Sequence, residues 1–92
     1  RFYWDDVGAW NAVEKYFEKN SNRNAVKGDF LGEDCDECFI YNSSGLTIAG
    51  VGLDEMIVVA ADDAVLICPR DRAQDVKKIV KKLTKEGRDE LI

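Results

Sequence analysis

Two short segments of this 92-residue sequence carry side chains whose types and spacing suit metal chemistry. The first is Cys35-Asp36-Glu37-Cys38, which has the spacing of a metal-binding or redox-active cysteine pair. A structural zinc site needs four ligands, whereas the chain has no histidine and only one further cysteine, Cys68. A redox pair opens a helix within a βαβ unit, and this pair instead precedes an extended segment. We therefore interpret Cys35 and Cys38 as two unrelated cysteines in a turn.

The second segment is Trp4-Asp5-Asp6-Val7-Gly8-Ala9-Trp10. A carboxylate followed by a tight glycine turn into a helix can present an oxygen ligand to Mg²⁺, with substrate phosphates supplying other ligands. The same carboxylate can instead cap the helix by accepting a backbone N–H bond, with the aromatic side chains buried behind it. The residue types alone favour the cap and leave the metal ligand as the alternative.

Other catalytic arrangements are missing from the sequence. The absence of histidine removes the commonest general base and the usual nucleophile triads. None of Gly45, Gly50 and Gly52 is followed by a helix or by a Lys-Ser/Thr pair, so no phosphate-binding glycine loop is present. Composition and spacing therefore indicate that the chain is not an enzyme on its own.

The balance of charge and apolar residues restricts the partners and the compartment. A net charge of −5 and a pI near 4.6 disfavour binding to nucleic acid or to an anionic membrane, and no apolar run approaches the roughly 18 residues of a membrane span. An odd number of cysteines without a secretion signal suggests the reducing cytoplasm. Because the chain lacks an initiator Met, we expect it to be part of a longer protein. Five lysines are interpreted as the solvated face of a helix rather than a phosphate patch: Lys77, Lys78, Lys81, Lys82 and Lys85.

Periodicity predicts a helix at each end of the chain. The first runs from about Asp6 to Glu18, is capped by Asp5 or Asp6, and has one aromatic face formed by Trp10, Val13, Tyr16 and Phe17. The second runs from about Asp71 to Glu86. Its predicted features are a capping box formed by Asp71 and Gln74, an apolar stripe (Val76, Ile79, Val80, Leu83) and a left-handed C-cap at Gly87.

Between the helices the sequence predicts about five short strands separated by turn residues. They are Ala25–Lys27, Cys38–Asn42, Leu46–Leu53, Met56–Ala60 and Ala64–Cys68. Ile57-Val58-Val59 and Val65-Leu66-Ile67 lack apolar–polar alternation, which is typical of strands buried on both faces. No six-residue repeat of a regular β-helix is present.

Several motifs occur in the order seen in one enzyme family. They are Trp4–Ala12, Asn24–Asp29, Val51–Val59, Asp63–Ile67, Arg72–Lys77 and Gly87-Arg88. Together they resemble the bacterial mannose-1-phosphate guanylyltransferases, which include forms fused to mannose-6-phosphate isomerase. Ala9 departs from the serine usual in that family, and the Cys35–Cys38 turn is not a family feature.

The resemblance implies a fragment of an enzyme that transfers GMP from GTP to mannose-1-phosphate and releases pyrophosphate. It implies that Asp6 is a Mg²⁺ ligand and that Gly8 keeps the backbone close to the sugar-phosphate site. The nucleotide-binding loop belongs to the family's N-terminal part, so the isolated chain is expected to be inactive and to contain no catalytic residue of its own. The family's small β domain, related to a left-handed β-helix, serves packing and assembly, so a homo-oligomer is expected.

We therefore predict an α+β fold with an N-terminal helix, about five strands in a small β-helix-like or meander unit, and a C-terminal amphipathic helix. Residues 1–20 would end the nucleotidyltransferase domain, and residues 21–92 would form the small β domain. The resemblance favours stacked parallel rungs, whereas Ala61-Asp62-Asp63 equally suits an antiparallel hairpin. A noncatalytic binding or oligomerisation module is the alternative function. Whether an isomerase domain follows Ile92 is left open by the sequence.

Overall fold

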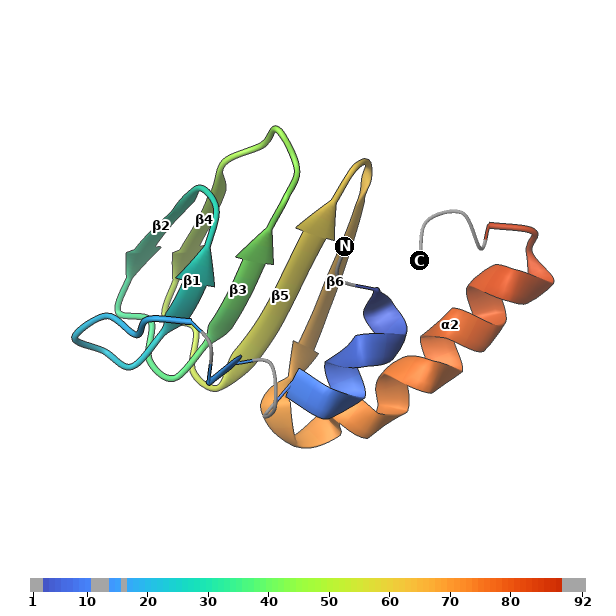
Figure 1. Cartoon of the computed structure of the whole chain (residues 1–92), viewed down its shortest axis with the longest axis horizontal. Coiled ribbons are helices and arrows are strands. Elements are labelled where there is room, and N and C mark those ends of the chain that lie inside the picture. The colour runs from blue at the N-terminus through green and yellow to red at the C-terminus, as the bar shows by residue number, and fades with distance from the viewer. Residues whose placement is uncertain (1–2, 11–13, 16, 89–92) are drawn as a thin grey trace.

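The larger of two sheets in this chain lies between two separate apolar cores, as seen in a computed structural model that describes residues 3–10, 14–15 and 17–88. Six strands are present in these residues: β1 (Ala25–Lys27), β2 (Phe30–Glu33), β3 (Phe39–Asn42), β4 (Ile48–Val51), β5 (Met56–Ala61) and β6 (Ala64–Pro69). They form a four-stranded sheet of order β1-β3-β5-β6 and a two-stranded sheet of β2 and β4. The helical segments lie on one side of the larger sheet, and the smaller sheet lies on the other (Figure 1).

Both strand-pairing alternatives occur, each in a different part of the molecule. β1, β3 and β5 pair in parallel, and so do β2 and β4, which gives short stacked rungs of a β-helix type. β5 and β6 instead pair antiparallel through the turn at Asp62, whose φ is 55°. The predicted α+β class with a β-helix-like unit is confirmed, and the antiparallel strand ends the stack of parallel rungs.

Alternation along β3 and β5 divides the apolar side chains between the two cores. Phe39, Ile57 and Val59 face the helical side, whereas Ile40 and Val58 face the two-stranded sheet. This double burial accounts for the missing alternation in Ile57-Val58-Val59. The same interpretation of Val65-Leu66-Ile67 is wrong, because β6 extends past the smaller sheet and leaves one face uncovered. Leu66 is buried, but Ile67 is 62% exposed.

Strand β2 was not predicted, and it completes the parallel pairing with β4. Its burial is slight, since only Phe30 is partly buried while Leu31 and Glu33 face solvent. Gly32 interrupts its pattern because an added Cβ there would lie 2.8 Å from the Phe30 ring. A four-residue strand with a glycine inside gives too little signal in sequence to separate it from a turn.

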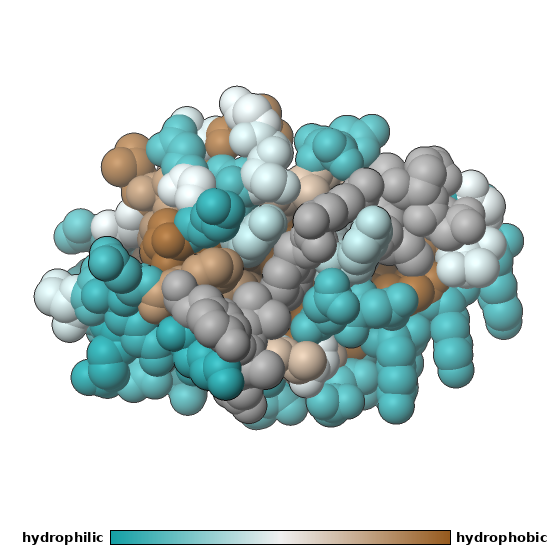
Figure 2. Space-filling model, in the orientation of Figure 1, coloured by the Kyte–Doolittle hydropathy of each residue, from teal (hydrophilic) through white to brown (hydrophobic). Residues whose placement is uncertain are grey.

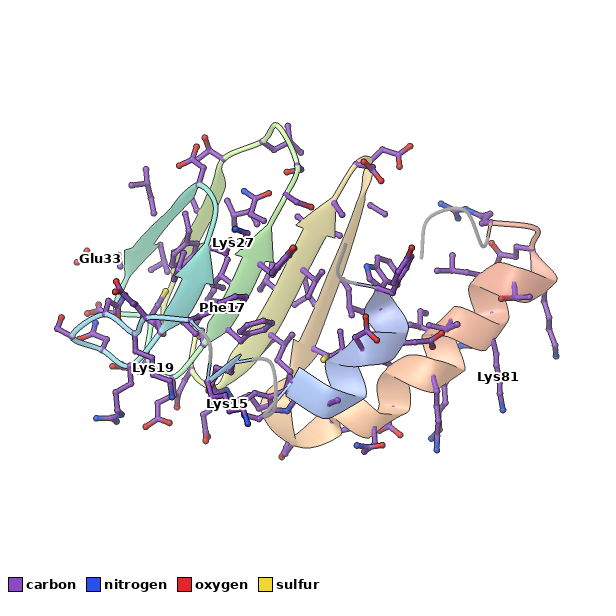
Figure 3. All side chains as sticks on the ribbon, viewed as in Figure 1. Lys15, Phe17, Lys19, Lys27, Glu33 and Lys81 are labelled. Atoms are coloured by element: carbon purple, nitrogen blue, oxygen red, sulfur yellow. The ribbon has the colours of Figure 1, made fainter. Side chains whose placement is uncertain are left out.

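The N-terminal helix differs from its prediction. Trp4–Ala9 forms a 3-10 helix, η1, and Trp10 and Glu14 are helical. Val13 and Tyr16 of the predicted aromatic face lie outside the described residues. Phe17 follows in a bend and stacks on Phe39 with ring centroids 5.5 Å apart, so it packs against the sheet (Figure 3).

The C-terminal helix is likewise divided in two, a 3-10 segment η2 (Arg70–Asp75) and an α-helix α2 (Val76–Lys85). The predicted capping box of Asp71 and Gln74 is wrong, because Pro69 occupies the N-cap and no side chain caps the segment. The left-handed C-cap is confirmed. Gly87 has φ 71°, and the N–H groups of Gly87 and Arg88 donate to the carbonyls of Thr84 and Leu83.

The predicted apolar stripe of α2 faces the helical side of the large sheet. Val76 is buried in that core, and Val80 and Leu83 pack against it, while Ile79 lies at the margin. Hydrophilic side chains project along α2 (Figure 2). Lys81 points away from the sheet (Figure 3). None of the described helices has the length and apolar character needed to cross a membrane. The proposed division at residue 20 stays a prediction.

Candidate functional site

The predicted metal-ligand segment is η1, whose side chains divide between the core and solvent. Trp4 and Val7 are buried among Phe39, Ile57 and Leu66 of the large sheet. Asp5 and Asp6 lie on the opposite side and are exposed. The core residues therefore fix the orientation of the segment, and the two carboxylates face outward.

Asp6 also closes the first turn of η1. Its Oδ2 accepts a hydrogen bond from the backbone N–H of Tyr3 at 3.1 Å, and its own N–H donates to the Tyr3 carbonyl at 2.9 Å. Asp6 thus does accept a backbone bond, but from the residue before the helix, as the third residue of a capping box does. Its second oxygen, Oδ1, has no hydrogen-bond partner in the described part of the chain. One oxygen of the Asp6 carboxylate can therefore close the turn while the other stays available to a ligand outside the described residues.

Gly8 adjoins the C-terminal part of the chain. Its carbonyl accepts a hydrogen bond from Gln74 Nε2 at 3.2 Å. An added Cβ at Gly8 would meet the Gln74 side chain at 3.5 Å, which is ordinary van der Waals contact, and Gly8 is not among the residues with positive φ. Among the residues that the structure describes, neither the backbone nor the surrounding space therefore requires glycine at position 8.

A buried ion pair ties the chain just after η1 to the start of η2. Arg70 donates a hydrogen bond to Glu14 Oε2, and the Lys19 ammonium lies 3.2 Å from Glu14 Oε1. The Arg70 guanidinium also lies 4.1 Å from the centroid of the Trp10 ring, a cation–π distance. Only 7% of the Glu14 side chain is exposed, so these cations offset the cost of burying its charge.

The cysteines do not form a chemical site. Cys35 and Cys38 are both free and buried, and their thiols donate weak bonds to the carbonyls of Gly50 and Asp36 at 3.4 Å. Burial raises the pKa of the Cys38 thiol, which opposes formation of a reactive thiolate. Within the residues that the structure describes, no group of three or more Cys, Asp or Glu side chains is placed to hold a metal.

A pocket beside the ion pair does not suit a phosphate. It has a volume of about 490 Å³ and is lined by Trp10, Asp54, Glu55, Pro69, Arg70 and Asp71. Among its described lining residues, Arg70 is the one cation and is already paired with Glu14, whereas three lining residues are carboxylates. A triphosphate would meet net negative charge there, so this pocket offers no GTP site.

Three residues of this region were not predicted: Glu14, Arg70 and Gln74 in its observed role. The signal for Glu14 was present, because a lone carboxylate lies among the apolar positions of the first helix. Gln74 was noticed, but its partner was placed in its own helix. Only the folded chain brings it to a carbonyl on a segment 66 residues away.

Stacked parallel rungs, a closing antiparallel strand and a C-terminal helix define a small β-helix-type domain, here carrying a carboxylate-bearing helical segment at its N-terminal side. Residues 28–83 match the family described as MannoseP isomerase/GMP-like beta-helix domain. This chain belongs to that family.

Relatives of the whole chain are longer proteins. The chain is 44% identical over 89 residues to a mannose-1-phosphate guanylyltransferase from Salmonella montevideo, which covers 97% of this chain and 19% of that protein. It is 39% identical to the alginate biosynthesis protein AlgA of Pseudomonas aeruginosa, over 95% of this chain and 18% of that protein. The chain thus spans less than a fifth of these relatives.

A solved structure shares the fold. It is the crystal structure of a mannose-1-phosphate geranyltransferase, so described, from Thermus thermophilus. The TM-score is 0.69 with 33% sequence identity, and the match covers 87% of this chain and 24% of the other. The sequence resemblance and the structural likeness therefore point to the same family.

Proposed function

We propose that this chain is the C-terminal part of a mannose-1-phosphate guanylyltransferase, which makes GDP-mannose and pyrophosphate from GTP and mannose-1-phosphate. The observation that carries the proposal is the match of nearly the whole chain, at 44% identity, to a protein of that name. The chain contributes one carboxylate, Asp6, and the backbone at Gly8 to a site completed by the rest of the parent enzyme. The isolated chain is inactive and binds GTP weakly, because the described residues include no set of donors aimed at a triphosphate.

The residues of η1 fit a Mg²⁺ ion as one ligand of several. Asp6 is exposed, carboxylate oxygen is the ligand type that Mg²⁺ prefers, and Oδ1 is unpaired in the described part of the chain. A single carboxylate cannot hold the ion alone, so substrate phosphates and other residues of the parent must supply the remaining ligands. When bound, the ion would neutralise charge that develops on the phosphates during transfer.

Four residues of the segment, together with the preceding Tyr3, then have separate tasks. Asp6 supplies the negative charge toward the ion, and Tyr3, through its backbone N–H, holds that carboxylate in place. Gly8 leaves room for the sugar phosphate where a side chain would intrude. Trp4 and Val7 anchor the segment in the core.

The proposal is tested by Asp6→Asn in the parent enzyme. The amide keeps the size and can still accept the Tyr3 N–H bond, but it loses the charge, so turnover should fall on the order of a hundredfold or more at unchanged thermal stability. Asp5→Asn is the matched control, because Asp5 is the exposed neighbour on the same turn and should tolerate the change. Equal turnover of Asp6→Asn and the wild type at saturating Mg²⁺ would reduce Asp6 to a residue that closes a turn.

The chain also offers a surface for assembly of the parent. Apolar side chains are exposed on strands of both sheets, namely Leu31, Val51, Val65 and Ile67. Exposed apolar groups of this kind favour association. They are also the observation that favours the alternative function, a noncatalytic binding or oligomerisation module. Measuring the activity of the parent on GTP and mannose-1-phosphate separates the two functions. Activity that is lost in Asp6→Asn supports the guanylyltransferase over the noncatalytic module.

A further inference from the structure

We infer that Gln74 is a positioning residue for Asp6: the C-terminal segment η2 holds the metal-ligand turn of η1 through the Gly8 carbonyl. This inference rests on the proposed role of Asp6. Gln74 belongs to the Arg72–Lys77 segment, which the proposed function otherwise leaves without a task. Its side-chain amide crosses to η1 instead of capping its own helix.

Within the described residues, η1 is held at three places: by a bond inside its first turn, in its middle and near its end. In the first turn, the Tyr3 N–H donates to Asp6 Oδ2. In its middle, Val7 is fully buried against the sheet. Near its end, the Gly8 carbonyl accepts a hydrogen bond from the Gln74 side-chain amide at 3.2 Å. This bond lies two residues after Asp6 in the chain, and its donor is exposed to solvent.

The third attachment matters because η1 is short and irregular. It is a 3-10 helix of six residues, and such helices hold their shape poorly since their hydrogen-bond geometry is weaker than that of an α-helix. Asp6 and Gly8 lie two residues apart in the same short helical segment, so a shift of the backbone at Gly8 also moves the turn that carries the exposed carboxylate. A hydrogen bond from a well-packed neighbouring element limits that shift.

The element that carries Gln74 is itself well fixed. Ala73 and Val76, on either side of it, are buried in the same core as Trp4 and Val7. Arg70, one turn earlier, pairs with Glu14 and lies on Trp10. Gln74 thus contacts the metal-ligand turn through one hydrogen bond, and the segment that carries Gln74 is itself packed in the core. Residues that orient metal ligands in other proteins are arranged in the same way.

The Gln74 contact is suited to positioning rather than to stability. Gln74 is exposed, so water can replace its bond to Gly8 when the side chain is lost. A substitution there should leave the fold intact and change only how firmly the turn is held. Gln74→Met keeps the length without the donor, and Gln74→Glu keeps the shape but places a carboxylate against a carbonyl.

The test uses the full-length parent enzyme and three measurements. We expect Gln74→Met and Gln74→Glu to raise the Mg²⁺ concentration for half-maximal activity by roughly tenfold, the usual effect of losing a group that orients a ligand. Hydrogen–deuterium exchange should become faster in the peptide covering residues 3–10. The melting temperature should change by less than about 2 °C. Asp71→Ala, an exposed change in the same η2 segment, is the control and should leave all three values unaltered.

Unchanged exchange in residues 3–10 would overturn the inference, as would an activity loss explained by a lower melting temperature. The proposed function can fail separately. If Asp6→Asn abolishes turnover while the Gln74 variants behave as wild type, the guanylyltransferase assignment stands and the role of Gln74 is wrong. If the parent makes no GDP-mannose, the proposed function is wrong, and the exchange measurement still decides whether Gln74 restrains the turn.

Discussion

At the scale of single residues, the segment Trp4–Ala9 contains positions that the fold requires and positions that it does not. Trp4 and Val7 are buried and serve the core. Gly8 is different, because neither its φ nor the space around it among the described residues requires glycine. Its proposed place beside the sugar phosphate of the parent enzyme would supply such a requirement.

Gly8→Ala separates these two demands. Alanine should leave the stability of the chain unchanged or raise it by up to about 1 kcal/mol, because glycine is the poorer residue in a helical segment. In the parent enzyme the added methyl should lower kcat/KM for mannose-1-phosphate by roughly tenfold, since small misplacements near the reacting groups are costly. Steady-state kinetics with GTP held at saturation and thermal unfolding give the two values. Wild-type kinetics in Gly8→Ala would remove Gly8 from the substrate site.

The Glu14–Arg70 ion pair also acts at the scale of single residues. It affects stability because each side chain neutralises the buried charge of the other. Replacing one partner by methionine should cost about 3 kcal/mol of unfolding free energy, because the other charge stays buried. The double variant Glu14→Met/Arg70→Met should be more stable than the sum of the single losses indicates. Denaturant unfolding of the four proteins measures the coupling.

The exposed Arg23–Glu37 pair is the control for this cycle. Its side chains are 67% and 37% exposed, so Arg23→Met should cost less than about 1 kcal/mol. Strictly additive losses at Glu14 and Arg70 would mean that the two charges are solvated independently.

At the scale of elements, the turns between strands show what the Asn24–Asp29 motif does in the fold. In Asn24–Asp29, the buried Asn24 accepts the Cys38 N–H at 2.8 Å and donates to the Cys35 carbonyl at 2.7 Å, which joins adjacent rungs. Gly28 turns the chain from β1 into β2 with φ 94° and touches the next rung at Asn42. The corners of the β-helix unit are therefore specified by polar and glycine residues rather than by a repeat.

Gly28→Ala should strongly destabilise the β unit. An added Cβ would lie 2.0 Å from the Asn42 carbonyl oxygen, and the positive φ adds strain for any L side chain. We expect a loss of about 3 kcal/mol or more, compared with the roughly 1 kcal/mol that strain at positive φ alone would cause. Gly45→Ala is the matched control, since nothing lies within 4 Å of its added Cβ, and it should be close to neutral. Chemical denaturation of both variants decides; similar stabilities would show that the corner can shift.

At the scale of the whole molecule, self-association of the isolated chain stays a prediction, and the fold indicates which surface would form the contact. Two candidates from the sequence are the aromatic face of the first predicted helix and the strand edge along Met56–Ala60. Trp4 is buried and Phe17 packs on Phe39, so these described aromatic residues are covered within the chain. β5 is flanked by β3 and β6, so its edges are paired. Among the strands that carry exposed apolar side chains, β6 lies at an edge of the larger sheet.

We therefore expect the isolated chain to associate through β6. Val65 and Ile67 are exposed on one face of it, and an edge strand with apolar side chains recruits a partner. Light scattering across a dilution series should show an increase in mass with concentration. Ile67→Lys should raise the protein concentration at which half of the chain is associated by at least about tenfold, since burying a lysine at such a contact is costly. Asn22→Lys adds the same charge in an exposed turn and should leave that concentration unchanged. A wild-type chain that stays monomeric across the dilution series would contradict the prediction.

Sequence alone determined the features that depend on local chemistry. Gly87 as a left-handed cap, the apolar stripe of Val76, Val80 and Leu83, and β1, β3, β5 and β6 to within a residue or so all follow from propensity and short-range pattern. The family was likewise legible in the order of motifs. The family resemblance, rather than residue type, singled out Asp6 as a metal ligand, and the structure adds that Asp6 faces outward from a segment anchored in the core.

Only the tertiary structure decided which distant residues meet. The same apolar pattern gives a doubly buried strand at Val58 and a half-exposed edge at Ile67, because burial depends on whether β2 and β4 extend beneath the strand. Gln74 was predicted to bond locally with Asp71, yet it binds Gly8, since packing of Ala73 and Val76 against Val7 places that carbonyl within its reach. Local propensity has no term for such contacts between segments far apart in the chain.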